Sequence, residues 1–89
     1  MNGLLSGKRI VITGAARGLG FHFAKACAEQ GAAVVMCDIL KGELAESAHA
    51  LSERGYAIEP HVIDLADPQS IEQVFSAVGE QGQIDGLAN

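Results

Sequence analysis

Apolar residues occur along the chain in blocks with two different spacings. Continuous apolar runs, rich in β-branched residues, cover Ile10 to Thr13 and Ala33 to Cys37. Runs without polar alternation are typical of strands that are buried on both faces, as in a parallel sheet. Weaker apolar segments, Ala57 to Ile63 and Ile84 to Ala88, predict a third and a fourth strand.

Helical spacing fills the intervals between these strands. Apolar residues recur there at intervals of three or four, which predicts three helices with one apolar face each. Gly31 and Gly55 follow the first and second helices as C-terminal stops. Asp67 and Pro68 provide an N-cap and a first-turn proline for the third helix. The apolar positions are Leu19, Phe23 and Cys27, with Ala24 and Ala28 alongside, in the first helix, Leu44, Ala48 and Leu51 in the second, and Ile71, Val74, Phe75 and Val78 in the third.

The resulting order of elements is β-α-β-α-β-α-β with short connections. Alternation of strand and helix requires right-handed crossovers and a parallel sheet. Pro60 has no N–H group to donate, so the third strand has to lie at a sheet edge or contain a bulge. The doubly wound strand order 3-2-1-4 places that strand at the edge. We therefore predict an α/β fold of the Rossmann type, with one domain at most in 89 residues.

A glycine-rich segment, GAARGLG, connects the first strand to the first helix. A glycine loop between strand and helix presents backbone N–H groups and the positive helix end to a phosphate. We expect Gly14 to make the tight turn, Gly18 to let a pyrophosphate approach the backbone, and Gly20 to permit close helix–strand packing. The spacing differs from the common Gly-x-Gly-x2-Gly pattern. Phe21 after Gly20 also excludes the GxxxxGK[ST] phosphate loop.

Asp38 closes the second strand, where dinucleotide-binding folds place an acidic side chain on the adenosine ribose. Such a residue accepts hydrogen bonds from the ribose hydroxyl groups. The alternative is an ordinary loop aspartate. Because Asp38 follows a strand, a glycine loop and a helix in the expected order, the ribose role is the better prediction.

Composition and charge exclude several other classes of protein. The net charge of −5 argues against nucleic acid or an anionic membrane as partner, and no apolar run approaches a membrane span of about 20 residues. Cys27 and Cys37 lack a CxxC arrangement, so we expect two buried thiols in a reducing cytoplasm. His22, His49 and His61 show no metal-ligand spacing with the cysteines, and no metal site is predicted.

Taken together, these segments resemble the short-chain dehydrogenase/reductase family over the whole chain. TGAARGLG, from Thr13 to Gly20, matches the family motif TGxxxGxG. Asp64 and Leu65 match the pair that contacts the adenine ring, and Asn89 matches the first asparagine of the NNAG motif. The resemblance implies a Rossmann fold and NAD-dependent transfer of hydride between nicotinamide and a secondary alcohol or ketone.

The catalytic Ser and Tyr-x3-Lys of that family have no counterpart in residues 1–89. The resemblance therefore implies that the chain corresponds to the N-terminal, cofactor-binding half of a Rossmann domain, cut off at the start of the NNAG motif. Catalytic residues would lie beyond it. Relatives are commonly dimers or tetramers, so a homo-oligomer is implied for the full-length protein.

The resemblance also assigns individual contacts to the cofactor. The segment from Gly14 to Leu19 should surround the pyrophosphate and the nicotinamide ribose, with the Leu19 N–H among the donors. Asp64 should bind the adenine amino group, while the Leu65 N–H reaches a ring nitrogen. Asn89 should line the cofactor and, with Thr13, connect neighbouring strand ends. For Asp64, a strand-end cap is the alternative role.

Three residues bear on the choice between NAD and NADP. Arg17 lies where NADP-dependent relatives often carry a base for the 2′-phosphate, although it could equally be an exposed loop arginine. Asp38 would repel that phosphate, and Ile39 stands where an NADP enzyme often has arginine. NAD is therefore the predicted cofactor.

Two other functions are compatible with a glycine loop and an acidic strand end. Methyltransferases that use S-adenosylmethionine combine the same two features, but they favour GxGxG after an acidic residue, whereas Thr13 precedes Gly14 here. A non-catalytic nucleotide-binding or sensing module would retain the cofactor site without the chemistry. Family residues following Asn89 would decide against this second alternative.

Overall fold

A computed structural model describes residues 3–88, which form four strands and three helices. The elements are β1 (Arg9–Thr13), α1 (Gly18–Glu29), β2 (Ala33–Asp38), α2 (Lys41–Glu53), β3 (Ile58–Val62), α3 (Pro68–Glu80) and β4 (Gly86–Ala88). All neighbouring strands are parallel, and their order is β3-β2-β1-β4. The predicted fold class and strand order are confirmed.

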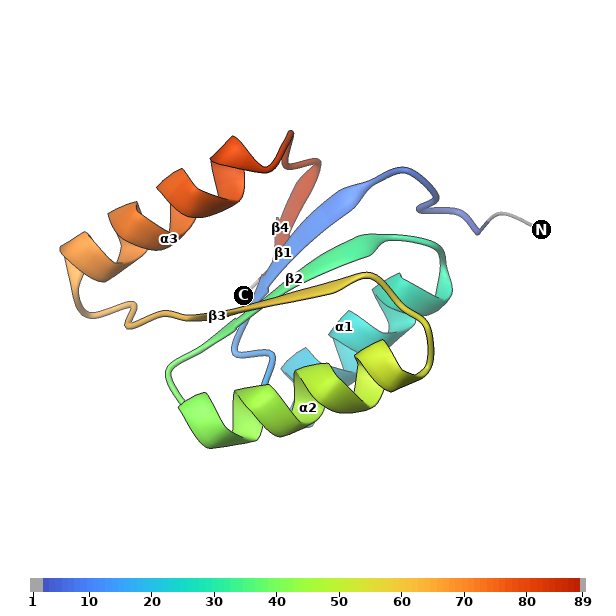
Figure 1. Ribbon diagram of the computed structural model, residues 1–89, viewed down its shortest axis with the longest axis horizontal. Coiled ribbons are helices and arrows are strands. Elements are labelled where there is room, and N and C mark those ends of the chain that lie inside the picture. Colours follow the sequence, from blue (N-terminus) through green and yellow to red (C-terminus); the bar gives the residue numbers. More distant parts are fainter. Residues whose placement is uncertain (1–2, 89) are drawn as a thin grey trace.

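The helices cover the sheet from both sides (Figure 1). Helices α1 and α2 lie together on one face, and α3 lies on the opposite face. Two apolar clusters fill the spaces between these layers, and β2 contributes alternate residues to each. Val34 and Met36 pack with Leu44 and Leu51 on the α1–α2 side. Val35 packs under α3 on the other side. Burial on both faces explains why β1 and β2 lack polar alternation.

The proline in β3 is tolerated because this strand forms one edge of the sheet. Pro60 pairs with Met36 of β2, and no other strand lies beyond it in the described sheet. β3 begins one residue later and ends one residue earlier than predicted. β4 begins at Gly86, two residues after the predicted start.

The apolar face predicted for α1 is confirmed at Ala24, Cys27 and Ala28 and wrong at Leu19 and Phe23. Leu19 is 86% exposed and Phe23 is half-exposed, while Cys27 is buried together with Ala24 and Ala28. These small residues belong to the apolar cluster that also contains Val34 and Met36 of β2. The predicted apolar residues of α2 and α3 are buried or partly buried as expected.

The predicted helix ends are confirmed. Gly31 and Gly55 follow α1 and α2 with φ of 94° and 90°, a conformation in which side chains are strained. Asp67 Oδ1 accepts a 3.0 Å hydrogen bond from the Gln69 N–H, with Pro68 in the first turn of α3. None of the helices in residues 3–88 combines the length and apolar character needed to cross a bilayer.

Candidate cofactor-binding site

The glycine loop between β1 and α1 lies at the carboxyl end of the sheet, and its three glycines have distinct roles. Gly14 and Gly18 have φ of 67° and 61°, and a Cβ at either position would meet no atom within 4 Å. A Cβ at Gly20 would lie only 1.9 Å from the carbonyl oxygen of Gly14. Gly20 is therefore needed for close packing, whereas Gly14 and Gly18 leave open space in front of the backbone.

Helix α1 starts at Gly18 without a protein cap. Its N-cap residue, Arg17, makes no side-chain hydrogen bond to the helix, and the first turn contains no acidic residue. The first N–H groups of a helix have no partners within the helix. Uncapped N–H groups beside open space fit a bound phosphate, so this cradle suits the pyrophosphate of a dinucleotide.

Asp38 lies at the end of β2 beside this loop, and its side chain is largely buried. The residue is 8% exposed. Its Oδ2 accepts a 3.0 Å hydrogen bond from the Ala16 N–H, and its Oδ1 accepts one of 3.0 Å from the Leu40 N–H. Each carboxylate oxygen can accept a further hydrogen bond. Asp38 thus holds the glycine loop in addition to facing the predicted ribose position, a role that the sequence analysis missed.

A hollow of about 290 Å³ lies beside Asp38 at the carboxyl end of the sheet. Five of its lining residues were predicted as cofactor contacts. Ile39 and Leu65 are exposed and give it apolar walls suited to a planar base. The complete lining is Gly14, Asp38, Ile39, Ile63, Asp64, Leu65 and Ala66. The structure therefore brings the residues predicted for the adenosine part of the cofactor into one place.

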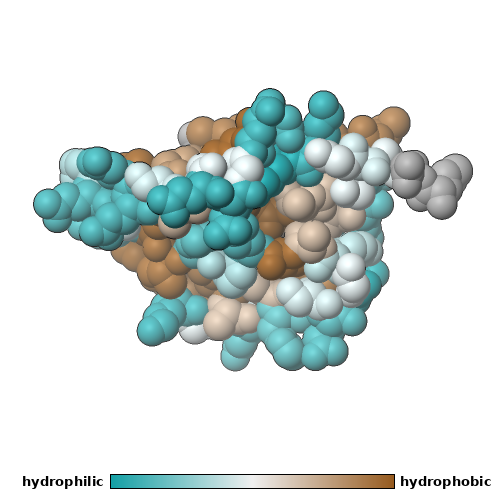
Figure 2. Space-filling model, turned by 45° about the horizontal axis from the view of Figure 1, so that its top comes forward, coloured by the Kyte–Doolittle hydropathy of each residue, from teal (hydrophilic) through white to brown (hydrophobic). Residues whose placement is uncertain are grey.

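A second hollow, of about 460 Å³, lies on the other side of Gly14. It is lined by Ile12, Thr13, Gly14, Leu19, Gly20, Phe23 and Ala88. Gly14 borders both hollows, and Leu19 with Phe23 forms an apolar wall that explains their exposure. Sequence reasoning assigned Phe23 to the core. On the face shown in Figure 2, hydrophobic surface (brown) is likewise exposed between polar bands.

Asp64 lies in the adenosine hollow but also stabilises a local turn. Its Oδ1 accepts a 2.9 Å hydrogen bond from the Ala66 N–H, and its own N–H donates to Ser70 Oγ. The alternative role expected for Asp64 was a strand-end cap, and its bond to the Ala66 N–H just after β3 agrees with that role. Since Oδ2 has no hydrogen-bond partner within residues 3–88, the carboxylate can serve both purposes.

Arg17 extends from the glycine loop toward α2 and borders neither hollow. Its Nε lies 3.6 Å from Glu43 Oε2, and the two side chains are 72% and 47% exposed. Gly18 also lies outside both linings. The sequence did not predict the ion pair between Glu43 and Arg17, because nothing in the spacing of Glu43 connects it with the glycine loop.

Thr13 connects the ends of β1 and β4. Its Oγ1 donates a 3.4 Å hydrogen bond to the carbonyl oxygen of Ala88. The predicted role of Asn89 lies outside the described residues.

Two cysteines and three histidines play no part in either hollow. Cys27 and Cys37 are buried, unpaired thiols, as expected. Burial, with smaller contributions from Glu59 and Asp38, raises the pKa of Cys37 to about 11, so it remains protonated. The described part of the chain contains no cluster of three metal-ligating side chains.

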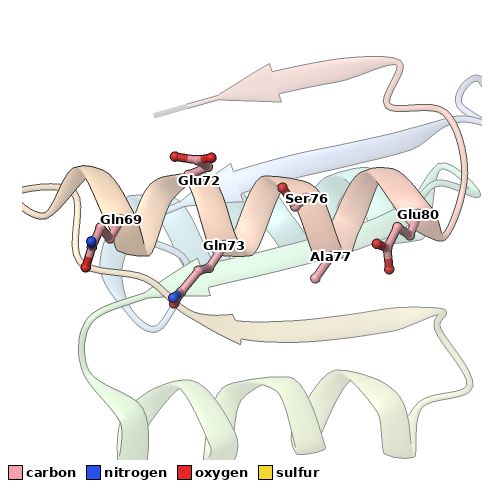
Figure 3. A pocket seen from close by; sticks show the side chains of 6 residues that line it. All are labelled: Gln69, Glu72, Gln73, Ser76, Ala77 and Glu80. Atoms are coloured by element: carbon pink, nitrogen blue, oxygen red, sulfur yellow. The ribbon is translucent and has the colours of Figure 1, made fainter.

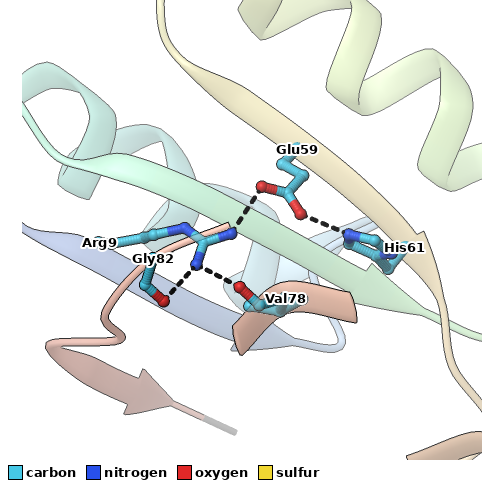
Figure 4. A network of polar contacts seen from close by, with 5 residues as sticks. All are labelled: Arg9, Glu59, His61, Val78 and Gly82. Atoms are coloured by element: carbon cyan, nitrogen blue, oxygen red, sulfur yellow. Dashed lines mark hydrogen bonds and ion pairs between the residues drawn. The ribbon is translucent and has the colours of Figure 1, made fainter. Parts of the chain in front are cut away.

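The remaining polar cluster lies between the sheet and α3 (Figure 4). Arg9 donates to Val78 O at 2.5 Å, to Gly82 O at 3.0 Å and to Glu59 Oε1 at 2.8 Å, and Glu59 Oε2 lies 2.6 Å from His61 Nε2. We call these five residues the Arg9 network. Burial raises the pKa of Glu59, but the hydrogen bonds from His61 and Arg9 outweigh it and hold the pKa below its ordinary value.

A larger hollow, of about 540 Å³, runs along the outer side of α3 (Figure 3). All its lining residues come from this one helix: Gln69, Glu72, Gln73, Ser76, Ala77 and Glu80. No second element converges on it. Ligand sites need polar groups that converge from several elements, so this surface is a solvated helix face.

Comparisons with known proteins agree with the geometry at the carboxyl end. A sequence model of the short chain dehydrogenase family matches residues 8–89. Galactitol 2-dehydrogenase of Agrobacterium fabrum is 43% identical over 86 residues, covering 96% of this chain and 32% of the relative. The chain thus spans about a third of the length of this relative.

Similar solved structures belong to the same family, and they contain two different cofactors. A short chain dehydrogenase/reductase from Burkholderia phymatum in complex with NAD superposes with a TM-score of 0.89 and 30% identity, over 93% of this chain and 30% of that one. Gluconate 5-dehydrogenase from Burkholderia cenocepacia, in complex with NADP and tartrate, gives a TM-score of 0.84 and 33% identity, over 93% and 33%. The chain belongs to the short-chain dehydrogenase/reductase family of oxidoreductases, which bind a nicotinamide cofactor.

Proposed function

We propose that residues 1–89 form the N-terminal, cofactor-binding part of an NAD-dependent oxidoreductase that transfers hydride between nicotinamide and a secondary alcohol or ketone. The observation that carries this proposal is the pair of hollows that meet at Gly14. One contains Asp38, Asp64 and Leu65, which suit an adenosine. The other is bordered by Leu19 and Phe23 and suits the nicotinamide side. The uncapped start of α1 follows the same glycine loop.

Charge favours NAD over NADP in this proposal. Asp38 is bonded only to backbone N–H groups, so no cationic side chain neutralises it within the described residues. A 2′-phosphate 4 Å from this carboxylate would be repelled by about 4 kcal/mol at an effective dielectric constant of 20. Arg17 is paired with Glu43, and Ile39 offers no charge. Since solved relatives bind either cofactor, these residues of the chain itself decide the choice.

The substrate class is supported by the relatives. The names galactitol 2-dehydrogenase and gluconate 5-dehydrogenase both indicate chemistry at a carbon–oxygen bond of a small polar molecule. A bound nicotinamide would supply or accept the hydride, while residues 1–89 bind and orient it. Groups that move the proton would lie outside this chain. A homo-oligomeric assembly and a cytoplasmic location stay predictions.

The test is to titrate the full-length protein with NADH, NADPH and S-adenosylmethionine by calorimetry and to assay secondary alcohols with NAD. We expect NADH to bind more tightly than NADPH, with NAD reduced in the presence of substrate. Tight NADH binding without turnover of any substrate would instead identify a non-catalytic nucleotide-binding module. Binding of S-adenosylmethionine in place of both dinucleotides would identify a methyltransferase.

A further inference from the structure

Helix α2 contacts the glycine loop through a side chain that no motif identifies. Ser47, in the middle of α2, donates a hydrogen bond from its Oγ to the carbonyl oxygen of Ala16. The Ala16 N–H is bonded to Asp38 at the same time. Both backbone polar groups of Ala16 are therefore held by side chains, one from the end of β2 and one from α2.

The bond from Ser47 also determines the direction of a neighbouring donor. The Ala16 carbonyl and the Arg17 N–H belong to one planar, trans peptide group, so they point in opposite directions. Holding the carbonyl toward α2 turns the Arg17 N–H away from α2. Arg17 is the N-cap residue of α1, directly before the uncapped first turn. Ser47 thus fixes the orientation of an N–H at the mouth of the phosphate cradle.

Other bonds hold the neighbouring groups of the loop, since the Ala15 N–H donates to Cys37 O and the Ala16 N–H donates to Asp38. Among the described residues, the Ala16 carbonyl accepts a hydrogen bond from Ser47 alone, and Gly18, after Arg17, has a positive φ that glycine adopts without strain. Serine within a helix commonly bonds a carbonyl one turn earlier in its own helix. The Ser47 hydroxyl instead crosses to the loop, while Leu44, Ala48 and Leu51 bury the core-facing side of α2.

We propose that Ser47 is a positioning residue for the cofactor, one that presets the Ala16–Arg17 peptide group for pyrophosphate binding. This inference rests on the proposed dinucleotide site. A preset loop loses less conformational freedom when the ligand binds, so the hydroxyl contributes to affinity without touching the cofactor.

The test compares Ser47→Ala with Ser47→Thr in the full-length protein, using the Kd for NADH and the steady-state constants with NAD. Loss of one hydrogen bond should raise the Kd about fivefold and the KM for NAD similarly, with kcat nearly unchanged. Ser47→Thr keeps the hydroxyl and should restore the wild-type Kd to within about twofold. Ser52→Ala, on an exposed part of the same helix, is the control and should change neither constant.

Each other outcome overturns the inference in a different way. An unchanged Kd in Ser47→Ala, or a Kd that Ser47→Thr fails to restore, means that the hydroxyl does not preset the loop. If Ser47→Ala does not fold, Ser47→Cys preserves the size and weakens the donor, and wild-type affinity in that variant is equally decisive. A wild-type protein that binds neither NADH nor NADPH defeats the proposed function itself, and this inference with it.

Discussion

Asp38 and Glu59 are carboxylates on neighbouring strands of one sheet, yet their surroundings differ. Glu59 belongs to the Arg9 network, where it meets the guanidinium of Arg9 and the imidazole of His61. Asp38 meets only backbone N–H groups, and it borders a hollow. The charge of Glu59 is balanced within the protein, whereas that of Asp38 is available to act on a ligand.

The same contrast holds for the regions around these two residues. The Arg9 network connects β1, β3 and the end of α3, and its polar groups bond one another. At the carboxyl end, polar groups and exposed apolar side chains surround open space. Substitutions in the Arg9 network should therefore change stability, and substitutions at the carboxyl end should change cofactor binding.

The largest effect is expected at Asp38. Replacing it with Ala removes hydrogen bonds of about 1.5–3 kcal/mol each to the ribose, together with the repulsion of a 2′-phosphate. The ratio of kcat/KM for NAD to that for NADP should fall about a hundredfold. Adding Ile39→Arg should then favour NADP outright, because it places a cationic side chain beside the expected 2′-phosphate. The measurement is this ratio in the full-length enzyme and in both variants.

Asp38→Asn separates the effect of the negative charge from the effect of the bonds that hold the glycine loop. The amide oxygen can still accept a hydrogen bond from one of the two backbone N–H groups. This substitution should change the cofactor ratio while disturbing the loop less than Asp38→Ala. Asp64→Asn is the matched control and should affect NAD and NADP equally, since the proposed contact of Asp64 is with the adenine, which both cofactors share. The ribose assignment would be contradicted if the wild-type enzyme preferred NADP. It would also be contradicted if the NAD-to-NADP ratio of kcat/KM stayed the same in the Asp38 variants.

Arg9→Met should give the second-largest effect, on stability rather than on binding. It removes the guanidinium that bonds Glu59 and the last turn of α3, where positive charge also favours the helix dipole. We expect the free energy of unfolding to fall by about 2 kcal/mol in urea titrations. The Kd for NADH should remain unchanged. Lys8→Met, at the exposed neighbouring position, should alter neither quantity.

The contrast between these regions was only partly predictable from the sequence. Spacing of apolar residues and Pro60 identified the elements and the edge strand, because those signals are local. The motif located the hollow through Gly14, Asp38 and Asp64. Local signals could not reveal the two-sided hold on Ala16, since Asp38 and Ser47 approach it from distant parts of the chain. The Arg9 network could not be predicted either, because Arg9, Glu59 and Val78 are far apart in the sequence.

Exposure was the other quantity that sequence reasoning misjudged. Leu19 and Phe23 have helical spacing with the buried Cys27, so periodicity alone assigns them to the core. In the structure they border the second hollow instead. A periodic apolar residue at the start of a helix that follows a glycine loop can thus line a surface hollow instead of the core.

Gly18→Val tests the phosphate cradle and should weaken NADH binding at least tenfold, or about 1.4 kcal/mol. The new side chain would occupy the open space where the pyrophosphate is expected. Because φ at Gly18 is 61°, valine there also strains the backbone. Gly7 has φ of 81° and equally open surroundings, so Gly7→Val reproduces the strain alone. Equal losses of NADH affinity in both variants would refute a cradle at Gly18.

The smallest effect is expected at Glu43, which pairs with Arg17 across the outside of the loop. Exposed ion pairs contribute only about 0.2–1 kcal/mol, so Glu43→Gln releases Arg17 at little cost in stability. The freed guanidinium can then approach a 2′-phosphate. We expect the Kd for NADPH to fall about two- to threefold while the Kd for NADH stays constant.

Salt and a neighbouring carboxylate sharpen this last test. The gain in NADPH affinity should shrink as ionic strength rises, because the Debye length falls to about 3 Å at 1 M salt. Glu46 is also exposed on α2 and makes no ion pair in the described structure, so Glu46→Gln changes the net charge equally without releasing Arg17. If both variants improve NADPH binding to the same extent, the gain comes from net charge. If only Glu43→Gln does so, the position of Arg17 contributes to cofactor choice alongside the unbalanced charge of Asp38.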